Sequence, residues 1–241
     1  MSVFNIKVAD IVIGIESVHV LPYALSRLFF TDESPAIKII STQADIDAEK
    51  PLYEAENRLT ASWDGAVEVA VLLHKVAESV IDYGAFVMHG AAIAVNDEAY
   101  LFTANSGVGK TTHAMKWLAN VPDAYVVNGD KPFILTGDTP MVCGSPWAGK
   151  EGMHTNKIVP LKAIVMLERS EENEIHRIPF VEAFPILYQQ IHRPTEIEKM
   201  KKSLSLLKTL DGKVGLYCFK MNNFKDDCLQ VSYEALTGKK L

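Results

Sequence analysis

The stretch FTANSGVGKTTHA, residues 102–114, decides the fold of this chain. It follows an apolar run typical of a buried strand and precedes a run with helical spacing, so it predicts a strand–turn–helix unit. The pattern G-x-x-x-x-G-K-[ST] has this context in P-loop proteins, where successive backbone N–H groups surround a phosphate at the N-terminus of a helix. The sequence therefore predicts a nucleotide-phosphate site on this turn.

The residue types of the turn favour Mg-ATP as the ligand. Lys110 is placed to reach the β- and γ-phosphates, and the Thr111 hydroxyl is a natural Mg²⁺ ligand. Ala104 stands where the pattern has its first glycine, which costs on the order of 1 kcal/mol if the turn needs a positive φ there. Charge-assisted phosphate contacts of roughly 1.5–3 kcal/mol each outweigh this cost. We expect phosphate contacts from Asn105, Ser106, Gly107, Val108, Gly109, Lys110, Thr111 and Thr112.

Two further residues are candidates for the same site. The segment YVVNGDK, residues 125–131, predicts a buried strand that ends at Asp130. Because the carboxyl ends of neighbouring strands share one crevice in an open α/β sheet, Asp130 is a candidate Mg²⁺ ligand beside Thr111, although an ordinary turn aspartate is the alternative. His89 ends an earlier strand just before Gly90 and could face the same crevice, or be a strand-end histidine without a role.

The segment CGSPWAGKEGMHTN, residues 143–156, is too long for a simple turn and predicts a second binding loop. Lys150 could approach a phosphate or an acceptor, and Trp147 could stack on a base or cover the site. The alternative is that Lys150 and Glu151 form a solvated surface pair.

The rest of the chain predicts a mixed α/β fold. We expect one domain over residues 1–241, with an N-terminal part, 1–84, that carries no assignable motif, and a P-loop core over 85–241. The predicted strands cover residues 5–15, 36–41, 85–95, 99–103, 125–127, 132–135, 141–143, 161–167 and 214–219. The predicted helices cover residues 21–30, 64–84, 111–119 and 225–236, with one more from Pro194 to Gly212.

Composition excludes several classes of partner. The formal net charge of −6 argues against a nonspecific nucleic-acid or anionic-membrane surface. The sequence contains no export signal and no apolar run of the roughly 18 residues that span a bilayer. Its three cysteines have neither disulfide-framework nor zinc spacing, so we expect a cytoplasmic protein.

The motifs MHG at 88–90, ANSGVGKT at 104–111 and NGD at 128–130 together resemble the catalytic core of HPr kinase/phosphorylase, a bacterial serine protein kinase that shares its P-loop arrangement with phosphoenolpyruvate carboxykinase. The resemblance covers roughly residues 85–135. It implies that ATP and Mg²⁺ are used, that His89 lies beside the phosphate turn, and that Asp130 matches the second acid of the family's Asp-Asp pair. It also implies a homo-oligomer, because the related kinases assemble as oligomers.

The chain departs from this family in two places. The first acid of the pair, which activates the acceptor hydroxyl, aligns with Gly129, so Glu151 or His89 would have to act as the base. The Glu-x-Arg-Gly segment associated with phosphorolysis is missing.

These departures leave three functions open. The leading hypothesis is an ATP-dependent kinase that phosphorylates a hydroxyl of a protein, a peptide or a small molecule. The first alternative is a nucleotide-binding regulatory protein without catalysis. The second is a carboxykinase-like enzyme with a basic pocket from Arg169, Arg177 and Lys150.

Overall fold

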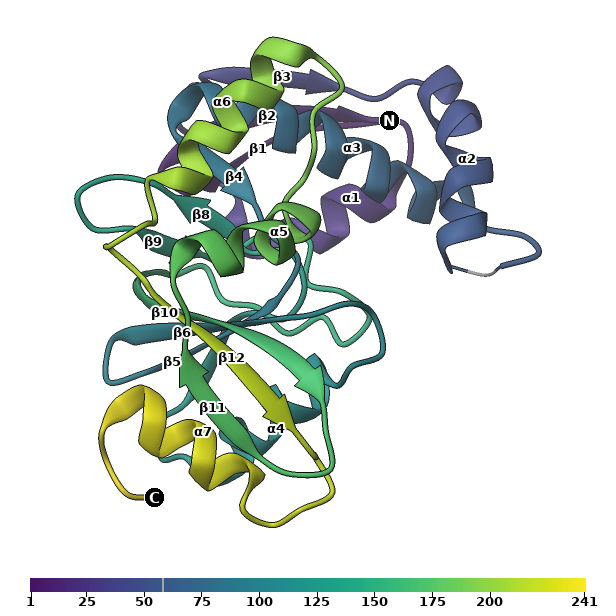
Figure 1. Cartoon of the computed structure of the whole chain (residues 1–241). Coiled ribbons are helices and arrows are strands. Elements are labelled where there is room, and N and C mark those ends of the chain that lie inside the picture. Colours follow the sequence, from purple (N-terminus) through teal and green to yellow (C-terminus); the bar gives the residue numbers. More distant parts are fainter. Residues whose placement is uncertain (58) are drawn as a thin grey trace.

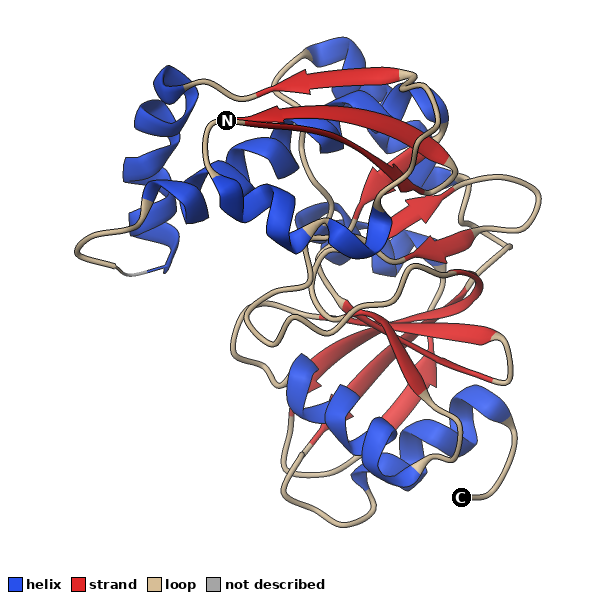
Figure 2. Ribbon diagram, turned by 180° about the vertical axis from the view of Figure 1, so that it is seen from behind, coloured by secondary structure: helices blue, strands red, loops and turns tan. Residues whose placement is uncertain are grey.

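The computed structural model describes residues 1–57 and 59–241. Within these residues the strands form a three-stranded sheet and a nine-stranded mixed sheet, so the predicted mixed α/β class is confirmed. The small sheet lies at one end of the molecule and the C-terminal helix at the other (Figure 1). Seen from behind, helices pack against the strands at both ends (Figure 2). No helix of the described chain is long and apolar enough to cross a bilayer.

The N-terminal layer combines the small sheet with three helices. Its strands are β1 (Ser2–Val8), β2 (Ile11–Ser17) and β3 (Ile37–Ile40), and its helices are α1 (Val20–Leu25), α2 (Gln43–Asn57) and α3 (Asp64–Val80). β1 and β2 are antiparallel, and β3 runs parallel to β2. Short 3-10 turns, Arg27–Phe29 and Ile81–Tyr83, follow α1 and α3.

A buried carboxylate fastens α3 to this layer. Glu68 is fully buried and accepts hydrogen bonds from Val18 N at 2.5 Å, His19 N at 2.7 Å and the Ser41 hydroxyl. A buried carboxylate without such donors would cost folding free energy. The contacts therefore fix the position of α3 relative to Val18 and His19, just before α1, and to Ser41, just after β3. α3 in turn forms one wall of the cleft described below.

The large sheet is organised around one long strand, β10 (Ile158–Arg169). Its first residues pair with β9 (Met141–Cys143), and its later residues pair in parallel with β6 (Glu98–Thr103) and β12 (Gly215–Met221). The remaining strands are β4 (Ala85–Val87), β5 (Ala91–Val95), β7 (Tyr125–Asn128), β8 (Phe133–Leu135) and β11 (Glu174–Arg177).

Four of these strands end at the same edge of the sheet. β6, β10 and β12 are parallel, and β7 has the same direction because both β6 and β7 are antiparallel to β5. The turn after β6 contains the P-loop pattern and the turn after β7 contains Asp130. Sheet topology therefore brings the two predicted parts of the site to one edge.

Helices cover both faces of the strands around β10. α4 (Lys110–Asn120) and α7 (Cys228–Thr237) bury Trp117 and Tyr233 against Val165 and Phe219 on one face. α5 (Phe180–Gln190) and α6 (Ile197–Lys208) cover Ile164 and Met166, which point to the other face. This alternation along β10 explains why the strand reads as continuously apolar in sequence.

Several predicted elements are confirmed, but two of the predicted strands are each divided between two strands of the structure. Residues 64–84 are helical and end at Gly84, whose φ is +76°. Residues 5–15 are not one strand but parts of β1 and β2, because Ala9 and Asp10 form a turn with φ of 53° and 59°. Residues 85–95 are also divided, because the chain leaves β4 and crosses to β5 at residues 88–90.

Two of the predicted helices also have different boundaries in the structure. The helix predicted to start at Pro194 begins at Ile197, with Glu196 as its N-cap residue. The helix predicted over 21–30 is the short α1 followed by a 3-10 turn. Three further elements, α2, α5 and β11, had no predicted counterpart in the sequence.

Candidate functional site

The turn between β6 and α4 has two glycines in the left-handed region and leads directly into a helix. Gly107 and Gly109 have φ values of +81° and +121°, which disfavour any side chain. A Cβ on Gly109 would also lie 2.5 Å from the Asn223 side-chain nitrogen. The first hydrogen bond of α4 runs from His113 N to Gly109 O. The amides of Lys110, Thr111 and Thr112 therefore belong to the helix end that attracts anions.

Ala104 fits this turn without backbone strain. Five non-glycine residues of the described chain have positive φ, and Ala104 is not among them. Its methyl group is buried in the core that α4 and α7 share with the sheet. Ala104 therefore does not have the free-energy cost that an alanine has in a left-handed conformation. The absence of the first glycine does not distort the loop.

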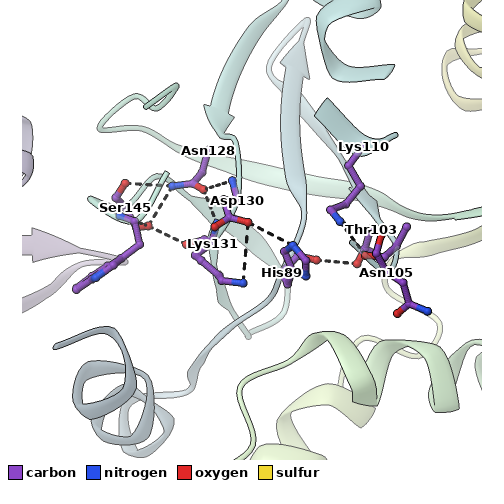
Figure 3. Close-up of polar contacts among 10 residues, drawn as sticks. His89, Thr103, Asn105, Lys110, Asn128, Asp130, Lys131 and Ser145 are labelled. Atoms are coloured by element: carbon purple, nitrogen blue, oxygen red, sulfur yellow. Dashed lines mark hydrogen bonds and ion pairs between the residues drawn. The ribbon is translucent and has the colours of Figure 1, made fainter. Parts of the chain in front are cut away.

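Lys110 folds back along the loop. Its Nζ donates to Ala104 O at 2.8 Å and to Asn105 O at 3.4 Å (Figure 3). Burial lowers the pKa of Lys110 from its ordinary value, and the nearby Asp130 carboxylate offsets part of that effect. The Asn105 side chain accepts a hydrogen bond from Gln190 Nε2 at 3.2 Å, so it is held by α5.

His89 and Asp130 form a pair at the mouth of the loop. His89 Nε2 lies 3.3 Å from Asp130 Oδ1, and Lys131 Nζ lies 3.9 Å from the same oxygen (Figure 3). Burial would raise the pKa of Asp130, but the His89 hydrogen bond and the cationic Lys131 and Lys110 outweigh it, so the pKa is lowered. Burial, reinforced by the two lysines, lowers the pKa of His89 despite the Asp130 contact. At neutral pH the pair is therefore a carboxylate beside a neutral imidazole.

Three elements fix the backbone of His89. Its N–H donates to Gln190 O at 2.7 Å, and its carbonyl accepts the Thr103 hydroxyl at 2.7 Å. Gly90 N donates to Asp130 O at 2.8 Å, and a Cβ on Gly90 would lie 2.8 Å from Phe102 O. The glycine of the M-H-G motif thus permits the close approach to β6 that brings His89 to the P-loop.

Asn128 shapes the Asp130 turn. Its buried side-chain oxygen accepts the N–H groups of Asp130 at 2.9 Å and Lys131 at 2.8 Å. Its side-chain nitrogen donates to Ser145 O at 3.1 Å and Ser145 Oγ at 3.0 Å (Figure 3). Sequence reasoning missed this role, although an asparagine two residues before an aspartate is a known turn signal.

The loop after β9 closes the space beside Gly129. Gly129 N donates to Met153 O at 2.9 Å. A Cβ on Gly129 would lie 3.2 Å from Ala148 O and 3.3 Å from Met153 O, so a larger side chain would press on two backbone carbonyls. Backbone from residues 144–155 therefore borders Gly129 closely and leaves little room for a side chain at this position.

Trp147 lines the cleft, but its ring is held in the core and is not free to stack on a base. It is 6% exposed, it stacks on Phe133 with ring centroids 5.9 Å apart, and its Nε1 donates to Val69 O at 2.9 Å. The tryptophan therefore anchors the loop to α3 and cannot present a free face to a nucleotide base. Lys150 and Glu151 are exposed on the same loop.

All of the predicted site residues except Asn105 and Val108 line one cleft of about 840 Å³. The P-loop, His89, Asp130 and the loop with Lys150 and Glu151 form one side. Within the described residues, the side chains of Lys150 and Glu151 make no hydrogen bond or ion pair with the Lys110–Asp130–His89 group. The opposite wall, which the sequence did not assign, comes from the N-terminal layer and includes Leu21, Leu25, Tyr53, Val69, Leu73 and His74.

The residues present fit Mg²⁺ held with a nucleotide. The described residues contain no cluster of three or more His, Cys, Asp or Glu side chains that could hold a metal ion by themselves. Mg²⁺ characteristically binds through one or two protein oxygens together with substrate phosphates and water. The Thr111 hydroxyl and the Asp130 carboxylate line the same cleft and are suitable oxygen ligands.

Comparisons with known proteins give structural likenesses only. No protein-family model matches the chain, and no curated protein matches its sequence. Among solved structures, the HPr(Ser) kinase/phosphatase from Coxiella burnetii is similar, with a TM-score of 0.37 and 10% sequence identity. The match covers 62% of this chain and 95% of that one. This likeness is too distant to carry the activity of that protein to this chain.

Proposed function

We propose that this chain binds Mg-ATP at the P-loop and transfers the γ-phosphate to a hydroxyl of an acceptor held in the cleft. The observation that carries the proposal is the convergence of Lys110, Asp130 and His89 on the cleft that the P-loop lines. A phosphoryl-transfer site needs cationic and N–H groups around the moving phosphate and a group that accepts the acceptor's proton. Both kinds of group occur here within one cavity.

The nucleotide side uses the loop amides, Lys110 and a magnesium ion. The amides of Gly107 to Thr112 and the Lys110 ammonium would neutralise charge on the transferred phosphoryl group. The Thr111 hydroxyl and Asp130 would hold Mg²⁺, which supplies further charge neutralisation on the phosphate oxygens. The lowered pKa of Asp130 keeps that ligand ionised at neutral pH.

The acceptor side uses His89 as the base. Asp130 Oδ1 faces His89 Nε2, which favours the tautomer with the proton on Nε2 and the lone pair on Nδ1. The acceptor hydroxyl would give its proton to Nδ1 as its oxygen bonds to the γ-phosphorus, and the bond to the bridging oxygen breaks to release ADP. In this proposal His89, which its burial keeps neutral, acts as the base in place of the acid that is missing at Gly129.

A calorimetric titration of Mg-ATP tests the nucleotide site. We expect Lys110→Ala to weaken binding about tenfold or more, because a buried charge-assisted contact is lost and each decade corresponds to about 1.4 kcal/mol. Lys116→Ala, on the same helix but outside the cleft, is the matched control and leaves binding unchanged. Equal binding by wild type and Lys110→Ala, or no binding by either, contradicts the proposal.

One observation favours the regulatory alternative. Backbone from residues 144–155 fills the space beside Gly129, so the acid of the related kinases cannot simply be accommodated there. Release or transfer of the γ-phosphate separates the two functions. Turnover that falls at least tenfold in His89→Gln while Mg-ATP still binds supports the kinase, whereas tight binding without turnover in wild type supports a regulator.

The three cations considered for a carboxykinase-like pocket do not converge in the structure. Arg169 donates to Gly107 O and lies outside the residues that line the cleft. Arg177 lines a separate cavity of about 390 Å³ together with Phe180 and Asp211. Of the three cations considered, only Lys150 lines the cleft.

A further inference from the structure

The sheet topology sets the direction in which a nucleotide must lie. Asp130 and His89 lie on the side of the P-loop towards β5 and β7, where the cleft opens. The strands on the other side of β6 are β10 and then β12, both parallel to it. A triphosphate whose γ-end faces Asp130 therefore points its nucleoside over the carboxyl ends of β10 and β12.

The ends of these two strands are fastened to the P-loop. Arg169, the last residue of β10, donates to Gly107 O, and Asn223, after β12, donates to Gly109 O at 3.3 Å. Asn223 also accepts a hydrogen bond from the Cys228 thiol, 3.5 Å away at the start of α7. The loop between β12 and α7 is therefore held in a fixed place beside the phosphate loop.

Phe224 projects from the middle of this fixed loop. Its side chain is 98% exposed, more than any other large apolar side chain of the described residues. The backbone beneath it is ordered, because Phe224 N donates to Asn222 Oδ1 at 3.0 Å and Lys225 N donates to Asn222 O at 3.1 Å. An aromatic ring held in water on a fixed loop contributes nothing to the core, and its face is free to stack on a planar ligand.

We infer that Phe224 is the stacking platform for the purine base of the bound nucleotide, an inference that rests on the proposed function. The position follows from the topology, and the chemistry follows from the aromatic face, since bases stack on exposed aromatic side chains. In this arrangement the adenosine lies over the β12 end while the γ-phosphate lies at Asp130.

The side chains of Asn222, Asn223 and Lys225 in this loop are already engaged. Asn222 contacts the Phe224 and Glu171 backbones, and Asn223 contacts Gly109 O. Lys225 is paired with Glu172. Because these groups do not present a free hydrogen-bonding edge to a base, recognition is by the ring face, and ATP and GTP bind with affinities within a few-fold of each other.

Calorimetric titrations with Mg-ATP, Mg-GTP and Mg-tripolyphosphate test this inference on the whole chain. We expect Phe224→Ala to weaken binding of both nucleotides about fivefold or more, given about 1–3 kcal/mol for stacking one base and about 1.4 kcal/mol per decade of affinity. Tripolyphosphate, which has no base, binds wild type and variant equally. Phe224→Trp restores nucleotide affinity, and Val181→Ala, at another exposed apolar position, changes nothing.

The outcomes separate this inference from the proposed function. Unchanged ATP affinity in Phe224→Ala overturns the stacking platform while leaving the phosphate site intact. Wild type that binds tripolyphosphate as tightly as ATP also overturns it, because no base is then held. An ATP affinity more than about tenfold above that of GTP overturns recognition by the ring face alone. If wild type binds neither ATP nor tripolyphosphate, the proposed function fails, and the inference fails with it.

Discussion

Replacing Asn128 with alanine tests how the Asp130 turn is held. The wild-type side chain is fully buried and bonds to the N–H groups of Asp130 and Lys131 and to both oxygens of Ser145. The variant keeps the backbone path but removes every one of these contacts. Because Asp130 is at once the partner of His89 and the proposed metal ligand, we expect losses of both stability and function.

The size of the stability loss follows from which groups lose all of their partners. Lys131 N still donates to Trp147 O at 3.1 Å, and Ser145 Oγ still donates to Lys131 O at 2.7 Å. Asp130 N and Ser145 O have no other partner among the described residues. An unsatisfied buried polar group costs about 1–3 kcal/mol, so the two groups together lower the free energy of unfolding of Asn128→Ala by about 2–6 kcal/mol. This is a large share of the roughly 5–15 kcal/mol typical of a folded domain.

Urea denaturation followed by tryptophan fluorescence measures this change. Asn128→Ser is the graded variant, because a serine hydroxyl can accept the Asp130 N–H and reduces the loss. Asn120→Ala is the control, since the Asn120 side chain is exposed and bonds only to Lys116 O. A free energy of unfolding for Asn128→Ala within about 0.5 kcal/mol of wild type would show that the turn is held by other contacts, and would refute the reasoning.

Further predictions concern pH, the loop glycines and the P-loop alanine. Burial lowers the pKa of His113 and of His192 to about 4, whereas histidines of the unfolded chain titrate near 6.5. The unfolded state therefore binds more protons, and the free energy of unfolding falls as the pH drops from about 6.5 to about 4. Urea titrations across this range measure the fall, which becomes smaller in His113→Gln. Gly129→Asp loses about 1–3 kcal/mol of stability by urea denaturation and gains no turnover, because its side chain presses on Ala148 O and Met153 O. Ala104→Gly does not improve Mg-ATP affinity by more than about twofold in calorimetry, because Ala104 has no positive φ to relieve; a larger gain would contradict the backbone argument.

The sequence predicted best those features that depend on neighbours in the chain. The P-loop turn and α4 were predicted because the glycines, the lysine and the helical spacing are all local signals. Asp130 was correctly expected at the same edge of the sheet as the turn after β6, because the carboxyl ends of neighbouring parallel strands share one crevice. Ala9 and Asp10 escaped prediction because alanine gives no warning of a positive φ and a single aspartate gives only a weak one.

The rest of the site depends on contacts between distant segments. Trp147 was considered as a base-stacking residue because its loop is long, but its ring is buried through contacts with α3 and β8 that no local pattern reveals. The N-terminal wall of the cleft was likewise unassigned, since α2 and α3 carry no catalytic motif and reach the site only through tertiary packing. The position of Asn223 and Phe224 beside the P-loop depends on the pairing of β12 with β10, which no local pattern in the sequence reveals.

The long strand β10 constrains how this protein can move. One uninterrupted backbone pairs with β9 near the N-terminal layer and then with β6 and β12 beside the P-loop. The change of partners falls at residues 160–163, where the register to β6 shifts and Pro160 and Lys162 are exposed, whereas residues 163–167 are buried. Any change in the spacing of the two walls of the cleft would therefore have to be taken up in this short segment of β10, because the regularly paired part beyond it resists bending.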